Sequence, residues 1–316
     1  MASPTIWLYR RFLGLGDGEI RLARRGFPCD DPAIRKHLEE IGATVVAGCR
    51  AAFEARDEAE LEALLARTEL ERRGFAFEGA AMGLALLDRL TPWKRGRWAS
   101  FLRGPGDPHA YMVHVGAGLA LARLRRGPVA PVGADPLLAP LVADGCGFHD
   151  GFFRWSERAA GRPHPRAFRG YAARAYDQGL GRSLWFVRGA SAPRIAGAIE
   201  EFPAPRRADL WAGVGLACAY AGGVDRAAIE ELARLAGRCA PELAQGASFA
   251  SQARRRAGNP AAHTDLACRV LCASSSEEAA DVAVRALVGL PPDGERPAYE
   301  AWRRRVRSRF LESGVT

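Results

Sequence analysis

Three short segments of this chain recur in the same order roughly one hundred residues later, and this repetition constrains the fold more than any other feature of the sequence. Repeats of this kind indicate that a structural unit has been duplicated. The matches are Gly116–Ala122 with Gly213–Ala219, Ala139–Phe148 with Ala240–Phe249, and Phe77–Gly79 with Tyr176–Gly179. The sequence therefore predicts two related halves that pack around a shared core or cleft.

Both halves are expected to be helical. Apolar residues recur at steps of three and four, for example from Ala33 to Glu54, while strict alternation of apolar and polar residues is essentially absent. We therefore predict an all-α fold with a lead-in over 1–30, a first half over 31–158, a second half over 168–290 and a basic helix over 295–312. With 316 residues, 48% of them hydrophobic, the chain is long enough to bury a large core as one intimate unit.

The net charge is strongly positive. A formal charge of +9, carried almost entirely by arginine, suits an acidic partner, but it equally suits an ordinary solvated surface in a protein from a GC-rich genome. The seven cysteines form no CxxC pairs, which favours free thiols in a reducing compartment. No apolar stretch reaches the length of a membrane span. We expect a cytoplasmic protein, peripheral to a membrane only through a partner, that binds no nucleic acid.

Two acids precede glycine-rich helical segments in corresponding places. Gly74 is expected to break the chain, so that Glu78 opens one helix, and Asp177 is expected to open another in the second half. Facing each other between the halves, the two carboxylates would form a general acid/base pair in which burial raises the pKa of one acid. The alternative is that each acid caps its own helix.

Histidines supply two further catalytic candidates. His114 lies in a segment of small residues, where it is either a buried base or a core histidine bonded to a carbonyl group. His149 has no polar counterpart in the other half and lies beside Asp144 and Asp150. The spacing of this acidic cluster matches no familiar metal motif, so no metal site is predicted.

The substrate-binding candidates come from the same repeated segments. They comprise aromatic side chains suited to an apolar groove and polar side chains that differ between the halves: Phe77, Phe148, Tyr176, Trp185 and Phe249, together with Gln178, Arg182, Ser183 and Gln245. Arg182 would bind a phosphate or carboxylate, or else pair with Asp177.

Several common motifs are missing from the sequence. It contains no phosphate-binding Walker loop, no strand-borne GxGxxG, no HExxH, no GxSxG, no Asp-rich diphosphate motif and no CxxCH. Nucleotide hydrolysis, dinucleotide-dependent redox chemistry, serine hydrolysis and ordinary terpene cyclisation are therefore disfavoured, and no cofactor is indicated by a motif.

Six strings of the sequence together resemble one protein family. They are RGFAFEGAAMGLALLD, DGCGFHDGFF, YDQGLGRSLWF, LWAGVGLACAYAGG, LAQGASFA and HTDLAC. The family is the enediyne biosynthesis protein family UnbL, also known as domain-of-unknown-function family 1702. The resemblance covers residues 25 to 310 and implies a bacterial natural-product biosynthesis protein. It supplies no agreed catalytic residues.

The resemblance also implies a substrate and partners. Members are encoded beside an iterative polyketide synthase, a thioesterase, UnbV-like proteins and membrane UnbU-like proteins, a set thought to convert a linear polyene toward the enediyne core. An acyl carrier protein is a further expected partner. Two functions remain open: an enzyme, or enzyme subunit, that modifies a polyene or another apolar unsaturated substrate, and a non-catalytic protein that binds the polyene for its partners.

Overall fold

The computed structural model describes residues 18–91, 93, 95–158, 162–294 and 296–312, so most of the predicted lead-in lies outside the described residues. The described residues form helices and no strand, as the all-α prediction requires. In chain order the α-helices are α2 (Pro32–Glu54), α3 (Glu58–Ala66), α4 (Arg73–Leu90), α5 (Arg97–Arg103), α6 (Ala110–Arg123), α7 (Pro140–Phe153), α8 (Trp155–Arg158), α9 (Tyr171–Val187), α10 (Ala192–Glu200), α11 (Ala204–Ala221), α12 (Arg226–Ala236), α13 (Ala240–Ala257), α14 (Ala262–Leu271), α15 (Ser276–Arg285) and α16 (Ala298–Glu312). Short 3-10 helices are η1 (Ala23–Arg25), η2 (Leu70–Arg72), η3 (Asp107–His109) and η4 (Gly237–Cys239).

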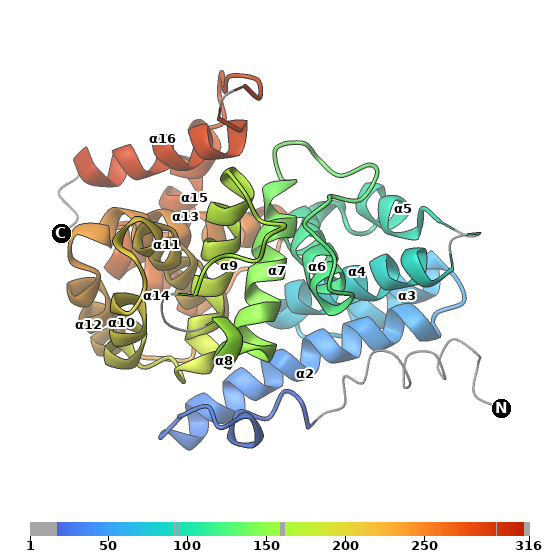
Figure 1. Cartoon of the computed structure of the whole chain (residues 1–316), viewed down its shortest axis with the longest axis horizontal. Helices are drawn as coiled ribbons and strands as arrows, with labels where there is room; N and C mark the ends of the chain where they lie inside the picture. Colours follow the sequence, from blue (N-terminus) through green and yellow to red (C-terminus); the bar gives the residue numbers. More distant parts are fainter. Residues whose placement is uncertain (1–17, 92, 94, 159–161, 295, 313–316) are drawn as a thin grey trace.

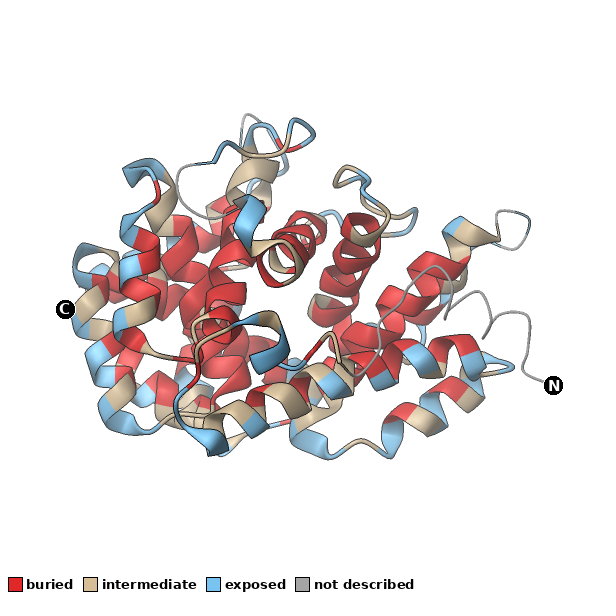
Figure 2. Ribbon diagram, turned by 60° about the horizontal axis from the view of Figure 1, so that its bottom comes forward, coloured by how far each residue is buried: buried red, intermediate tan, exposed pale blue. Residues whose placement is uncertain are grey.

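Six helices form a central row in which each packs against the next in chain order: α4, α6, α7, α9, α11 and α13. Their residues are predominantly buried, as Figure 2 shows in red. The row is curved, because its first helix also reaches its fifth: the ring centroids of Phe75 in α4 and Tyr220 in α11 are 5.1 Å apart. The curve creates an inner side on which side chains from several helices converge.

Glycines spaced two residues apart hold the central row together. In an α-helix this spacing places the two glycines on nearly opposite sides, since each residue turns the helix by about 100°. A Cβ atom on Gly116 of α6 would lie 2.2 Å from the carbonyl oxygen of Glu78 in α4, and one on Gly118 would lie 2.1 Å from that of Val142 in α7. Helix α6 thus offers one glycine to each of its two neighbours, and the backbones approach more closely than a residue with a Cβ atom would permit.

The same arrangement recurs along the row. Close backbone approaches join Gly145 with Val115, Gly147 with Tyr176, Gly179 with Asp144, Gly181 with Leu210, Gly213 with Gln178, Gly215 with Leu243, and Gly246 with Ala212. All three sequence matches include glycines of this set. The glycine contacts therefore explain the repeated strings helix by helix, while the division into two related halves stays a prediction.

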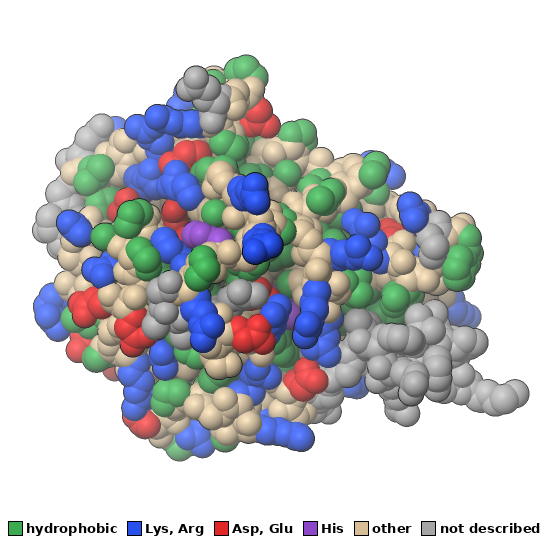
Figure 3. Space-filling view, viewed as in Figure 1, with side chains coloured by type: hydrophobic (Ala, Val, Ile, Leu, Met, Phe, Trp, Pro, Cys, Tyr) green, Lys and Arg blue, Asp and Glu red, His purple; other side chains and the backbone are tan. Residues whose placement is uncertain are grey.

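The remaining helices surround the central row. Figure 1 shows α2 crossing one side of it and α16 the opposite side. Helix α2 contacts both the first and the fifth helix of the row: a Cβ atom on Gly48 would lie 2.1 Å from the carbonyl oxygen of Ala76 in α4, and Nε2 of His37 is 2.7 Å from the carbonyl oxygen of Ala221 in α11. Helix α16 is anchored by the fully buried Trp302. On the face in Figure 3, basic and acidic side chains are interspersed, and a group of basic ones lies over α16.

Two predicted helix starts are wrong. Helix α4 begins at Arg73 and α9 at Tyr171, so Glu78 and Asp177 both lie inside their helices. Gly74 does not break the chain but lies inside α4. A larger residue at this position would collide with Tyr220, because the hydroxyl oxygen of Tyr220 lies 1.9 Å from where a Cβ atom would be. The glycine reflects a close contact inside the fold. Neither acid is therefore a cap of its own helix.

Candidate functional site

A cavity lies on the inner side of the central row and is covered by α2. Its walls come from α2, α4, α6, α7, α9 and α11, with Ile20 contributed from before α2. Its volume is about 80 Å³. Side chains from six helices border this small cavity, which is called the slot below. Its lining side chains are overwhelmingly apolar: Leu38, Ile41, Val45, Val46, Phe75, Met82, Met112, Leu119, Phe148, Phe152, Phe153, Phe186, Leu216, Ala217, Tyr220 and Ala221.

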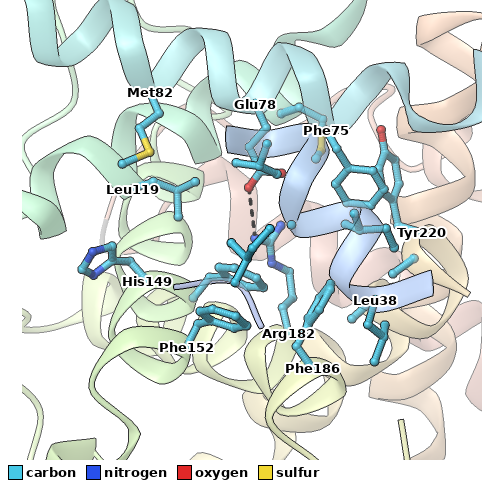
Figure 4. Close-up of a pocket in the computed structure, with 18 of the residues that line it drawn as sticks. Leu38, Phe75, Glu78, Met82, Leu119, His149, Phe152, Arg182, Phe186 and Tyr220 are labelled. Carbon is cyan, nitrogen blue, oxygen red and sulfur yellow. Dashed lines mark ion pairs between the residues drawn. The ribbon is translucent and has the colours of Figure 1, made fainter. Parts of the chain in front are cut away.

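One ion pair interrupts this apolar lining. Oε1 of Glu78 on α4 lies 3.8 Å from Nη2 of Arg182 on α9, and the two residues are 4% and 6% exposed. The Arg182 guanidinium also lies over the ring of Phe148, 5.0 Å from its centroid. Figure 4 shows the pair between two apolar arms, one with Met82 and Leu119 and the other with Phe75, Tyr220, Phe186 and Leu38. The charged groups therefore stand partway along the slot.

A second carboxylate competes for the same guanidinium. Oδ1 of Asp144 on α7 lies 3.1 Å from Nε of Arg182, closer than Glu78 does. Gln178 Nε2 donates a hydrogen bond of 2.8 Å to the other oxygen of Asp144 and one of 3.2 Å to the hydroxyl of Tyr299 on α16. The cluster of Glu78, Asp144, Gln178, Arg182 and Tyr299, here called the polar cluster, is thus anchored on its far side by α16.

Burial sets the protonation of the polar cluster. It raises the pKa of Glu78 to about 7, against the attraction of Arg182 and with the help of the Asp144 charge. Burial also raises the pKa of Asp144, which Arg182 and then Gln178 oppose. Two buried carboxyl groups share one cation, and Arg182 contacts Asp144 more closely, so Glu78 is the group that keeps a proton near neutral pH. A carboxyl group with such a pKa can both donate and accept a proton.

His149 lines the same cavity from α7 and is 3% exposed. Its Nδ1 lies 3.5 Å from Oδ1 of Asp150. The hydroxyl of Tyr176 donates a hydrogen bond of 2.9 Å to Oδ2 of Asp150, and Nη1 of Arg154 lies 3.6 Å from Oδ1. Burial lowers the pKa of His149, although Asp150 acts in the opposite direction, so the imidazole is neutral at physiological pH.

Asp177 occupies a different place. Its carboxylate accepts hydrogen bonds from Arg206 on α11, with Nε 3.0 Å from Oδ2, and lies 2.9 Å from Nε2 of His164. Asp177 is not among the residues that line the cavity. The structure therefore does not bring Asp177 and Glu78 together as an acid/base pair, and Arg182 pairs with Asp144 and Glu78 in place of Asp177.

His114 also lies away from the cavity lining. Its Nε2 accepts a hydrogen bond of 3.0 Å from the backbone N–H of Asp135, so its Nδ1 carries the hydrogen and donates to the carbonyl oxygen of Ala110 at 2.7 Å. Both ring nitrogens are satisfied by backbone groups. This geometry matches the alternative of a core histidine bonded to a carbonyl group.

Of the predicted aromatic residues, only Phe148 lines the cavity. Phe77 stacks on His109, with ring centroids 4.0 Å apart, and Phe249 stacks on Trp302 at 4.2 Å. Trp185 donates a hydrogen bond of 3.0 Å to the carbonyl oxygen of Gly222. These rings pack between helices of the core.

The remaining predicted polar residues have partners within the fold. Ser183 donates to the carbonyl oxygen of Leu180 at 2.6 Å, inside its own helix. Gln245 accepts a hydrogen bond of 3.1 Å from Arg303 of α16. Tyr176 and Gln178 do not line the cavity. Tyr176 donates a hydrogen bond to Asp150, and Gln178 donates one to Asp144.

Sequence reasoning missed most of the apolar lining. Phe152 is four residues after Phe148, a spacing that places both on one face of α7 and was a usable signal. Phe75, Phe186 and Tyr220 come from three other helices. Their convergence depends on the curvature of the central row, for which the sequence carries no local signal.

Groupings that would hold a metal are lacking in the part of the chain that the structure describes: no three His, Cys, Asp or Glu side chains come together in this way. All seven cysteines are free thiols, six of them buried. None of the helices among the described residues has the length and apolar character required to cross a membrane.

The chain was compared with protein-family models, with curated proteins and with solved structures. The model of the family described as "Protein of unknown function (DUF1702)" matches residues 5–310. Neither the curated proteins nor the solved structures gave a match.

Proposed function

The chain belongs to the DUF1702 family, and from this premise and the geometry of the cavity we propose that it binds a long, unsaturated, apolar chain around Glu78 and Arg182. The ligand we propose is a linear polyene of enediyne-type natural-product biosynthesis. This is the pathway in which the UnbL-like proteins that the sequence resembles take part. A polyketide synthase with its carrier protein would supply this ligand, and UnbV-like and UnbU-like proteins would be partners.

The observation that carries the proposal is a small, aromatic-lined slot with a protonatable carboxyl group between its two apolar arms. A conjugated chain is thin and rigid, so it fits such a slot and loses little rotational freedom on binding. Each Å² of apolar surface that it buries contributes about 25 cal/mol. A bulky ligand would not match the small volume of the slot, and a strongly charged ligand would not match its apolar lining.

The position of Glu78 suits chemistry at an interior carbon of the chain. A neutral carboxyl group partway along the slot faces the middle of a bound chain, where it would donate or accept a proton. Arg182 and Asp144 would hold that group in place and fix its protonation state. We therefore propose Glu78 as the acid/base residue of a polyene-modifying reaction.

Binding is tested by titrating the purified protein with a synthetic all-trans linear tetraene hydrocarbon and following its absorption bands, which respond to an apolar, rigid environment. Leu216 lines the slot and is half-buried, so Leu216→Trp should fill the slot with little damage to the fold. We expect Leu216→Trp to weaken binding at least tenfold. Leu311→Trp, the same change at a side chain that is 64% exposed on α16, should leave binding unchanged.

The role of Glu78 is tested with Glu78→Gln, incubated with the polyene in the presence of the polyketide synthase and the partner proteins. The variant should still bind the tetraene but should lose conversion of the polyene. An unchanged rate of conversion would refute the role of Glu78. Absence of tetraene binding by the wild-type protein, or equal binding by folded Leu216→Trp, would refute the binding function itself.

A further inference from the structure

His149 lines the slot and carries a ring nitrogen that has no hydrogen-bond partner among the described residues. In Figure 4, His149 lies on the same side of the Glu78–Arg182 pair as Met82 and Leu119. The other residues that line the cavity with them from α6 and α7, Met112 and Phe153, are also apolar. His149 is therefore the polar group of an otherwise apolar arm.

The neighbours of His149 decide which ring nitrogen carries the hydrogen. Nδ1 faces the carboxylate of Asp150, which can only accept a hydrogen bond. Asp150 accepts a hydrogen bond from the hydroxyl of Tyr176 and forms an ion pair with Arg154, and both neighbours favour a carboxylate at this position. The hydrogen therefore resides on Nδ1, and Nε2 presents a lone pair.

Nε2 of His149 is buried and has no hydrogen-bond partner among the described residues. A buried acceptor without a donor costs about 1–3 kcal/mol, so such atoms are rarely left in a protein without a purpose. A ligand group that donates a hydrogen bond would recover this free energy. A carboxylate would not, because both it and Nε2 are acceptors.

We propose that His149 accepts a hydrogen bond from a hydroxyl group at one end of the bound chain. The ligand would then be an unsaturated chain that ends in a hydroxyl, either an alcohol or an un-ionised carboxylic acid. Asp150 would be the positioning residue that fixes the imidazole. This inference rests on the proposed binding function and adds the chemistry of the ligand's end.

The test compares two ligands of equal length, the linear tetraene hydrocarbon and its terminal alcohol. The wild-type protein should bind the alcohol about tenfold more tightly, the value of one well-placed hydrogen bond. His149→Phe should abolish this preference. Phe152→Leu, a change at an apolar residue of the same cavity, should alter both affinities by the same factor. The tetraene carboxylic acid, titrated at low and high pH, separates the alcohol from the un-ionised acid as the preferred donor.

The comparison on the wild-type protein needs no variant, so it holds even if His149→Phe fails to fold. In addition, the ¹⁵N signal of Nε2 in histidine-labelled protein should shift with the alcohol and not with the hydrocarbon. Equal affinities for alcohol and hydrocarbon would overturn this inference and leave the binding function intact. If the wild-type protein binds neither, both proposals fail.

Discussion

The protonation of Glu78 should be visible in the stability of the whole protein. Glu78 is 4% exposed, and burial raises its pKa from an ordinary 4.5 to about 7. In the unfolded chain the carboxyl group regains its ordinary pKa. The perturbation is Glu78→Gln, which keeps the size of the side chain and removes its ionisation.

The sign of the effect follows from which state binds more protons. Between pH 4.5 and 7 the folded protein holds the Glu78 proton and the unfolded chain has lost it, so the contribution of Glu78 to stability is fully present below pH 4.5 and is lost as pH rises through 7. With these two pKa values, wild-type protein should lose ~2.5 kcal/mol relative to Glu78→Gln between pH 5 and pH 8.

The assay is urea denaturation of both proteins at several pH values from 5 to 8, with the free energy of unfolding extrapolated to water. The difference between the two proteins cancels the titration of all groups that do not interact with Glu78. Glu62→Gln, the same change at an exposed position of α3, controls for the chemical substitution. Parallel pH profiles of wild-type and Glu78→Gln protein would refute the conclusion that Glu78 keeps its proton.

Four further variants, which make three comparisons, test the packing and the charges. A Cβ atom on Gly213 would lie 1.9 Å from the carbonyl oxygen of Gln178, so Gly213→Ala should lower the free energy of unfolding by about 3 kcal/mol. Gly197→Ala, on an exposed helical position with nothing near, should raise it by about 0.5–1 kcal/mol; the same sign for both would contradict the role of the glycine contacts. Arg182→Met leaves the two carboxyl groups of the polar cluster without their cation, so it should lower the free energy of unfolding by about 3–5 kcal/mol at pH 8 but by less at pH 5. Equal losses at the two pH values in urea denaturation would argue against the pairing. Arg254 is 2% exposed and donates to three backbone carbonyl groups, so Arg254→Met should lower the free energy of unfolding by about 3 kcal/mol or more, and a loss below 1 kcal/mol would show that these bonds matter little.

Local patterns predicted the helices well and their starts poorly. The apolar steps of three and four over 33–54 correspond to α2, which spans Pro32–Glu54. Gly74 was interpreted as a break because glycine ends many helices, yet it lies inside α4 beside the hydroxyl of Tyr220. A tertiary contact explains that glycine, and no pattern within α4 reveals a partner nearly 150 residues away.

Helical geometry explains which predicted site residues meet. Gln178 and Arg182 are four residues apart on α9, so they share a face and both reach Asp144. Asp177 is one residue before Gln178, which turns its side chain by about 100° toward Arg206. The spacing within α9 was therefore sufficient to separate Asp177 from Arg182. The pairing of Arg182 with Glu78 and Asp144 required the arrangement of α4 and α7 around α9, which only the structure supplies.

The glycine contacts and the polar cluster involve the same residues. The backbone carbonyl groups that approach the glycines include those of Glu78 at Gly116, Asp144 at Gly179 and Gln178 at Gly213. The backbone is thus fixed at residues whose side chains form the polar cluster around Arg182. A buried acid keeps a perturbed pKa only if its neighbours are held in place, and a rigid backbone provides this. It follows that Gly213→Ala should disturb the titration of Glu78 as well as lower stability. Gly197→Ala, which touches no such contact, should leave that titration unchanged.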